Sequence, residues 1–176
     1  SANTTANSNT AVGYAALYAN TTGTGNNAFG AASLDANTTG NYNVAIGDSS
    51  LGAATTASGN TAVGSAAMTL TTTGANNTAV GLDALRANTT GADNTAVGYF
   101  ALSTNQTGTQ NVAVGRDALK VNVASWNTAI GREALKSNTT GGYNVAVGRT
   151  AAMLITTGAY NTAVGANSLD ANVTGN

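Results

Sequence analysis

The chain has 176 residues, only 7% of them charged, and a net charge of -1. Six Lys plus Arg are too few for the basic face that a nucleic-acid-binding protein needs. Without Cys or His the chain has no disulfide, no thiolate or imidazole metal ligand and no histidine general base, and no apolar run approaches the roughly 20 residues of a membrane helix.

A five-residue segment, exemplified by Asn94-Thr95-Ala96-Val97-Gly98, recurs ten times. The spacing is 17 residues except between Asn111 and Asn127, where it is 16. We number the repeat positions from this Asn, so that position 3 is always Ala and position 4 is Val, Ile or Phe. Position 1 and position 5 are Asn9 and Gly13, Asn26 and Gly30, Asn43 and Gly47, Asn60 and Gly64, Asn77 and Gly81, Asn94 and Gly98, Asn111 and Gly115, Asn127 and Gly131, Asn144 and Gly148, Asn161 and Gly165.

Strict self-similarity at a short period is the signature of a repeat architecture. The period is too short for a strand with a packed helix, and it suits a rung of strands and turns. The sequence therefore predicts an all-β protein, a parallel β-solenoid or β-roll of about ten 17-residue rungs. Residues 1–176 form a single repeat segment, and we expect it to be a piece of a longer fibre because residue 1 falls inside a repeat.

Each repeat divides into two short segments that end at Gly, which predicts two strands per rung. In the repeat at 94 they run over 94–97 and from about 101 to 105; a helical turn at positions 6–10 is the alternative. Because side chains alternate along a strand, Val97 and Thr95 share one face and Ala96 takes the other. We expect the bulky face to fill the rung and the alanine face to meet an opposite sheet or a neighbouring chain.

The Asn residues at positions 1 and 12 would stack in successive rungs and hydrogen-bond along the fibre. Gly at position 5 would allow a sharp turn. Several repeats depart from this pattern. In chain order, Ala54 and Ala57 replace Asn and Gly, Met68 and Thr71 replace Leu and Asn, the repeat at 111 loses one residue near Trp126, and the repeat at 144 carries the apolar run 151–155. We interpret that run as a local thickening of the core, with a partner contact as the alternative.

Charged residues fall at the variable positions, and Arg116, Arg132 and Arg149 all occupy position 6. With the acids beside them they predict a salt-bridged rim, with contact to an anionic glycan as the alternative. Trp126 is interpreted as the cover of a tightened turn or as a binding aromatic. These four residues are the candidate surface contacts. A nearly constant Thr at position 14 favours turn chemistry, or a water-ordering row of the kind found in ice-binding solenoids.

The Asn-Thr-Ala-Val-Gly and Asn-Val-Ala-Ile-Gly segments resemble the head repeats of trimeric autotransporter adhesins, the YadA-like family. That family has a Ser-Val-Ala-Ile-Gly type motif in each rung of a left-handed parallel β-roll. Similar Asn-Thr-Ala-Val-Gly repeats also occur in phage tail-fibre-like proteins. The resemblance covers positions 1 to 5 of every repeat; the longer period and Asn in place of Ser are departures from it. It implies a left-handed homotrimer.

Scattered carboxylates offer no positioned acid, base or nucleophile, so we expect no enzymatic activity, no cofactor and no metal. The expected function is that of an extracellular structural or adhesive fibre segment at a cell surface or on a virion. It would assemble with itself as a homotrimer or filament and present a polar surface to a host cell, glycan or matrix, with no nucleic-acid partner and no membrane insertion. The alternatives are a filament or phage tail-fibre shaft without a ligand of its own and, as the lesser one, an ice-binding solenoid.

Overall fold

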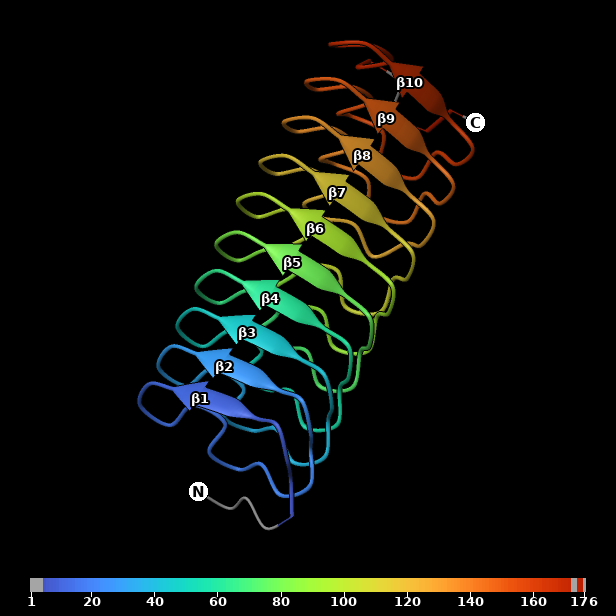
Figure 1. Cartoon of the computed structure of the whole chain (residues 1–176). Coiled ribbons are helices and arrows are strands. Elements are labelled where there is room, and N and C mark those ends of the chain that lie inside the picture. Colours follow the sequence, from blue (N-terminus) through green and yellow to red (C-terminus); the bar gives the residue numbers. More distant parts are fainter. Residues whose placement is uncertain (1–4, 172–173, 176) are drawn as a thin grey trace.

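A computed structural model describes residues 5–171 and 174–175 of the chain. It is a single sheet of ten parallel strands, stacked in sequence order into a straight rod (Figure 1). The strands are β1 Thr10–Val12, β2 Asn27–Phe29, β3 Val44–Ile46, β4 Thr61–Val63, β5 Thr78–Val80, β6 Thr95–Val97, β7 Val112–Val114, β8 Thr128–Ile130, β9 Val145–Val147 and β10 Thr162–Val164. The predicted all-β parallel solenoid is confirmed, while its handedness and its trimeric state stay predictions.

The sequence repeat and the structural repeat coincide. Each strand occupies positions 2 to 4, and alanine pairs with alanine in every register, as Ala79 does with Ala96 between β5 and β6. The one-residue deletion before Asn127 leaves the pairing of β7 with β8 in the same register. The deleted residue is therefore absorbed outside the strands.

The predicted second strand is wrong, because each rung contains one strand and the rest of it is a series of turns. The residues at positions 7 and 9 have positive φ, such as Phe100 at 55° and Leu102 at 53°, and this left-handed conformation is incompatible with a β-strand. Hydrogen bonds still join these turns along the rod, since the Leu102 N–H donates to the Ala118 carbonyl at 2.9 Å. No α-helix or 3₁₀-helix occurs in the described part, so the alternative helical turn is wrong as well, and no helix there could cross a bilayer.

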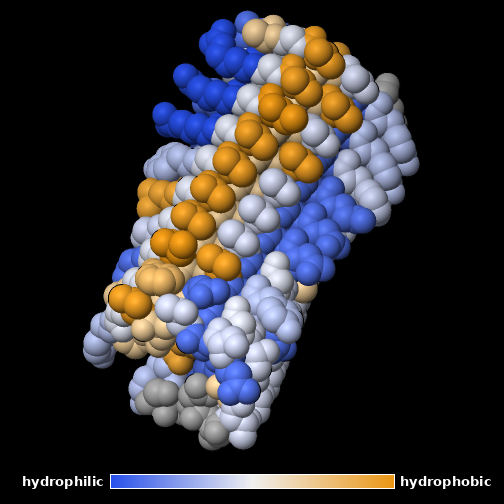
Figure 2. All heavy atoms as spheres, in the orientation of Figure 1, coloured by the Kyte–Doolittle hydropathy of each residue, from blue (hydrophilic) through white to orange (hydrophobic). Residues whose placement is uncertain are grey.

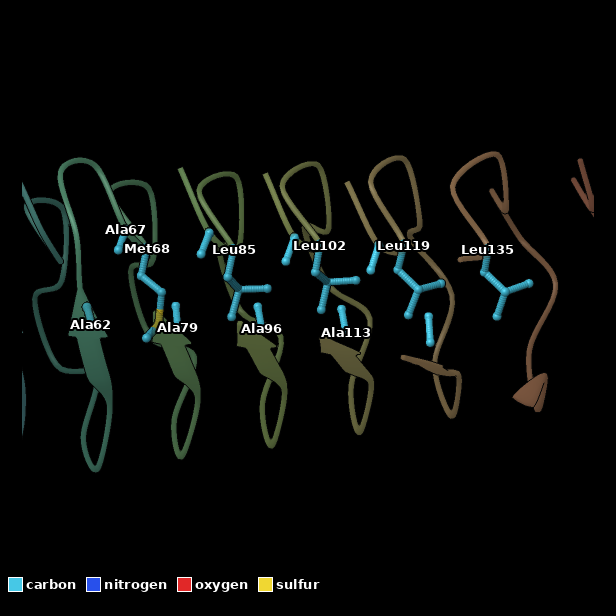
Figure 3. Packing of buried hydrophobic residues seen from close by; sticks show 14 of the residues in the cluster. Ala62, Ala67, Met68, Ala79, Leu85, Ala96, Leu102, Ala113, Leu119 and Leu135 are labelled. Atoms are coloured by element: carbon cyan, nitrogen blue, oxygen red, sulfur yellow. The ribbon is translucent and has the colours of Figure 1, made fainter. Parts of the chain in front are cut away.

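The predicted assignment of the two strand faces is also wrong. Ala96 is fully buried, whereas Val97 and Thr95 point outward and are partly exposed. The reason is that the Leu at position 9 enters the rung from the opposite side and fills it. Figure 3 shows Leu85 and Leu102 pointing toward the layer of strand alanines that includes Ala96. With the interior occupied by one leucine per rung, the strand has room only for a methyl group.

The apolar run 151–155 exchanges two core residues. Ala152 takes the position of the leucine, Ile155 takes the position of the second asparagine, and both are buried. The large buried apolar side chain of this rung therefore comes from position 12 instead of position 9. Leu154, between them, is 43% exposed. The prediction of a thickened core is replaced by this exchange.

The conserved Gly at position 5 is explained by its backbone. Gly98 has φ of 132°, and a Cβ atom there would lie 2.7 Å from the carbonyl carbon of Gly115 in the next rung. Both a left-handed conformation and the absence of a side chain are needed where the chain leaves the strand.

Two valine substitutions in β6 test which face is inside. Ala96→Val adds two methyl groups to a filled interior and should lower the free energy of unfolding by about 1–3 kcal/mol. Thr95→Val places the same side chain on the outward face, where other repeats already have Val112 and Val145, and it should change stability by less than about 0.5 kcal/mol. Urea denaturation of both variants measures the difference, and equal effects would contradict the assignment.

Candidate functional site

The asparagines at position 1 form a continuous column inside the rod, which we call the first asparagine column. Both the backbone N–H and the Nδ2 of Asn94 donate to Oδ1 of Asn77, at 2.9 and 3.1 Å. The Nδ2 also donates to the carbonyl of Gly108, at 2.9 Å, across its own rung. Asn111 repeats the pattern by donating to Oδ1 of Asn94. These asparagines therefore join the preceding rung, the following rung and the second turn of their own rung, although at Asn26, Asn127 and Asn144 only the backbone N–H bonds to the preceding asparagine of the column.

A second asparagine column stands at position 12, at that second turn. Nδ2 of Asn105 donates to Oδ1 of Asn88 at 3.2 Å and to the Gly108 carbonyl at 2.9 Å. The carbonyl at position 15 thus receives amides from both columns. A Cβ atom on Gly91, the position-15 residue of the preceding repeat, would lie 2.3 Å from Oδ1 of Asn88, so the second column and this glycine require each other.

The second column is interrupted wherever its asparagine is replaced. Oδ1 of Asn37, in the rung before Ala54, is buried without a hydrogen bond. Oγ1 of Thr71, in the rung after Ala54, is also buried without a partner. Oδ1 of Asn138 lacks a partner below Ile155. Each interruption leaves a buried polar atom unsatisfied, which costs stability.

The short repeat keeps the first column, since the Asn127 N–H donates to Oδ1 of Asn111 at 3.0 Å, but it breaks the second, because Oδ1 of Asn105 is buried without a hydrogen bond. The carbonyl of Ala124 accepts from Nδ2 of Asn111 at 2.8 Å and from Nδ2 of Asn122 at 2.7 Å, which is the role of position 15 elsewhere. The deletion therefore falls in the outer part of the turn. Trp126 follows this turn as the last residue of the short repeat, equivalent to position 17 of the others and called so below, and it is 47% exposed.

The outward face of the sheet is the most distinctive surface of the rod. Because side chains alternate along the strand, positions 2 and 4 point outward, and positions 17 and 6, which flank the strand, are exposed as well, as at Tyr143 and Arg149. Figure 2 shows an apolar stripe that runs the length of the molecule on this face. The outward stripe, as we call it, consists of the position-4 residues Val12, Phe29, Ile46, Val63, Val80, Val97, Val114, Ile130, Val147 and Val164 together with the position-2 residues Val44, Val112 and Val145. None of these side chains is fully buried.

The three arginines at position 6 border this stripe. Nε of Arg116 lies 3.1 Å from Oδ2 of Asp117, and Nη2 of Arg132 lies 3.3 Å from Oε2 of Glu133. Arg149 is followed by Thr150 and makes no salt bridge among the described residues. The predicted salt-bridged rim is therefore present at two of the three arginines.

The acids beside Arg116 and Arg132 have lowered pKa values. Burial of Asp117 acts to raise its pKa, but the hydrogen bond and the charge of Lys120, at 3.0 Å, and the contact with Arg116 outweigh it and hold the pKa below its usual value. The hydrogen bond from Lys136, aided by Arg132, lowers the pKa of Glu133 despite its partial desolvation.

Trp126 belongs to an aromatic column that the sequence reasoning missed. Its ring is parallel to that of Tyr143, with centroids 5.9 Å apart, and Tyr143 stacks in turn on Tyr160 at 5.0 Å. All three occupy position 17 and are exposed. Aligning the repeats by position instead of by motif would have revealed this column.

The threonines at position 14 are exposed, and their hydroxyl groups make no hydrogen bond among the described residues, as at Thr90 and Thr107. Hydroxyl groups at other turn positions do bond: at position 13, Oγ1 of Thr89 donates to the Gln106 carbonyl of the next rung at 3.0 Å, and at position 8, Oγ of Ser33 donates to the Gly30 carbonyl at 3.0 Å. The prediction of turn chemistry is therefore wrong for position 14. Ice binding by this row stays a prediction.

The described residues enclose no pocket and hold no cluster of acidic side chains that could bind a metal ion. Inside the rod run the two asparagine columns. Its surface carries the outward stripe, the three arginines and the stacked rings, each repeated from rung to rung. Such a surface can bind another repetitive surface along its length.

Comparison of the chain with protein-family models, with curated proteins and with solved structures finds no match. The resemblance to the YadA-like heads and to tail-fibre repeats rests on the repeat residues alone and stays a prediction.

The interrupted column at Ala54 and Ala57 can be repaired, which gives a quantitative test. Ala54→Asn alone should destabilise the rod, because its amide oxygen would meet the methyl group of Ala57. With Ala57→Gly added, the new amide can donate to Oδ1 of Asn37 and accept from Thr71, so the pair should show a favourable coupling of about 1–3 kcal/mol. A double-mutant cycle by urea denaturation measures this coupling, and additive effects would contradict the proposed link between the two positions.

Proposed function

We propose that the chain is a non-enzymatic structural segment of an extracellular fibre, in which copies associate through the outward stripe and leave the polar turns free for attachment. The observation that carries this proposal is the stripe itself, an apolar surface continuous over ten strands. Exposed apolar patches of this extent mark interaction sites on proteins.

The thin core of each rung supports the same proposal. The interior contains one large apolar side chain per rung together with alanines such as Ala96 and Ala101. Burying the outward valines against another copy would add apolar contact outside this small interior, at about 25 cal/mol per Å² of apolar surface. A trimer is the expected number of copies because the resembled adhesin heads are trimers.

The remaining faces support the attachment role. They carry exposed threonines and a few ion pairs, with no pocket among the described residues. A repetitive polar surface can bind a matrix or glycan through many weak contacts in register, because multivalency raises the overall affinity. Binding to matrix and glycan arrays separates an adhesive segment from an inert shaft.

Light scattering coupled to size-exclusion chromatography tests the association. The parent protein should form an oligomer, and replacing Val63, Val97 and Ile130 with Lys should yield a folded monomer, because three buried like charges in each copy oppose contact. The matched control replaces Thr73, Thr107 and Thr140, which lie in the same repeats, with Lys and should remain oligomeric. A parent protein that is a folded monomer would overturn the proposal.

A further inference from the structure

The outward face changes character in its C-terminal half, where two columns of side chains border the stripe. The arginine column, at position 6, consists of Arg116, Arg132 and Arg149, and the aromatic column, at position 17, consists of Trp126, Tyr143 and Tyr160. The side chains of Arg116 and Arg132 are 63% and 57% exposed. Figure 2 shows strongly hydrophilic side chains that project beside this end of the stripe.

The two columns extend over nearly the same rungs, but they lie on opposite edges of the outward face. In residues 126–132 and 143–149 an exposed aromatic residue precedes the strand and an exposed arginine follows it. Six residues separate them along the chain, and the three-residue strand lies between them, so the separation is at most about 20 Å. The strand therefore keeps the two columns apart within one chain.

Part of each column has unused binding capacity, although the guanidinium of Arg116 already lies over the Tyr99 ring of its own chain, 5.7 Å from the ring centroid. Arg149 makes no salt bridge among the described residues, and the hydroxyl groups of Tyr143 and Tyr160 make no hydrogen bond there. Gln110 occupies position 17 of the repeat before Trp126, so the outer face of the indole is not covered by another ring. Guanidinium groups bind aromatic faces and donate hydrogen bonds to phenol oxygens.

Symmetry decides which edges meet when two copies pack through their stripes. Rotation about an axis parallel to the rod places the position-6 edge of one copy against the position-17 edge of the other, at the same height. Antiparallel packing places position-6 edges together with the rod reversed, so that Arg149, Arg132 and Arg116 would face Ala31, Asp48 and Ser65. In the antiparallel arrangement, the three arginines would therefore face only one carboxylate, that of Asp48.

We propose that copies of this chain pack side by side, parallel and in register, with the arginine column of one copy against the aromatic column of the next. This contact fixes both the direction and the axial register, because the stripe alone repeats at every rung and would permit sliding. The inference rests on the proposed association through the stripe.

The size of the face fits such a contact. Ten strands at about 4.8 Å and a width of about 20 Å give roughly 900 Å² per copy, comparable to the roughly 800 Å² that each partner contributes to a standard interface.

Cross-linking tests the arrangement directly, because the described residues contain no cysteine and neither does the rest of the sequence. In a variant with Tyr143→Cys and Arg149→Cys, a short bis-maleimide should link different copies, since the two sites are too far apart within one copy. The comparison variant, Ala31→Cys with Arg149→Cys, should give links only if the copies are antiparallel.

The outcomes are distinct when the same samples are sized. An oligomer that is linked through 143 and 149, and not through 31 and 149, supports the proposal. An oligomer with the reverse pattern, or with neither link, overturns the parallel contact and leaves the association through the stripe intact. A monomeric parent protein overturns both.

Substitution of the arginines gives the energetic test. Arg132→Leu with Arg149→Leu should raise the dissociation constant of the oligomer about tenfold. Arg86→Leu removes an arginine from position 10, away from the outward face, and should leave the dissociation constant unchanged. Equal effects of the two changes would contradict a specific role for the arginine column.

Discussion

The first asparagine column is the interaction on which the rest of the rod depends. Within the column, the backbone N–H and side-chain amide of an asparagine together make hydrogen bonds to the rung before, the rung after and the far turn of its own rung, as Asn94 does with Asn77, Asn111 and Gly108. Because these groups are buried, leaving one unpaired costs far more than an exposed bond would gain. The column therefore sets the register of stacking, and the three-residue strands alone would specify it weakly.

The sequence was sufficient to predict the period, the parallel solenoid, the stacked asparagines and the turn at Gly98, because each follows from strict repetition. It was insufficient to assign the strand faces. A bulky Val97 beside a small Ala96 suggested that the valine fills the rung, but the leucine at position 9 already occupies that space. The leucine points inward because the residues at positions 7 and 9 are left-handed. Phe and Leu rarely adopt a positive φ, so this conformation at Phe100 and Leu102 could not be predicted from the residue types. The same residues explain why the expected second strand is a turn.

Because the rungs stack in register, residues at the same repeat position form a column along the surface of the rod. These columns connect the fold with the proposed function. A residue at a given position lies next to its equivalents in the adjacent rungs, so Trp126 becomes the end of a row of rings and Arg132 a member of a row of charges. The outward stripe is apolar because the alternation of the strand directs position 4 away from the core. A surface of this kind suits lateral association of rods, and the columns beside it can make one arrangement more stable than the others.

The stability of Asn94→Asp against pH tests the role of the first asparagine column most directly. The carboxylate would be buried beside Oδ1 of Asn77 and the Gly108 carbonyl with no donor to offer, so its pKa should be raised in the folded protein. The loss in free energy of unfolding should then be about 3–5 kcal/mol at pH 7, should shrink as the pH falls below that raised pKa, and should be smallest below the unfolded-state pKa of about 4, where the group is protonated in both states. Asn76→Asp is the matched control, because the next repeat already has Asp93 at that exposed position. If the two variants are equally stable at pH 7, the column does not hold the rungs together.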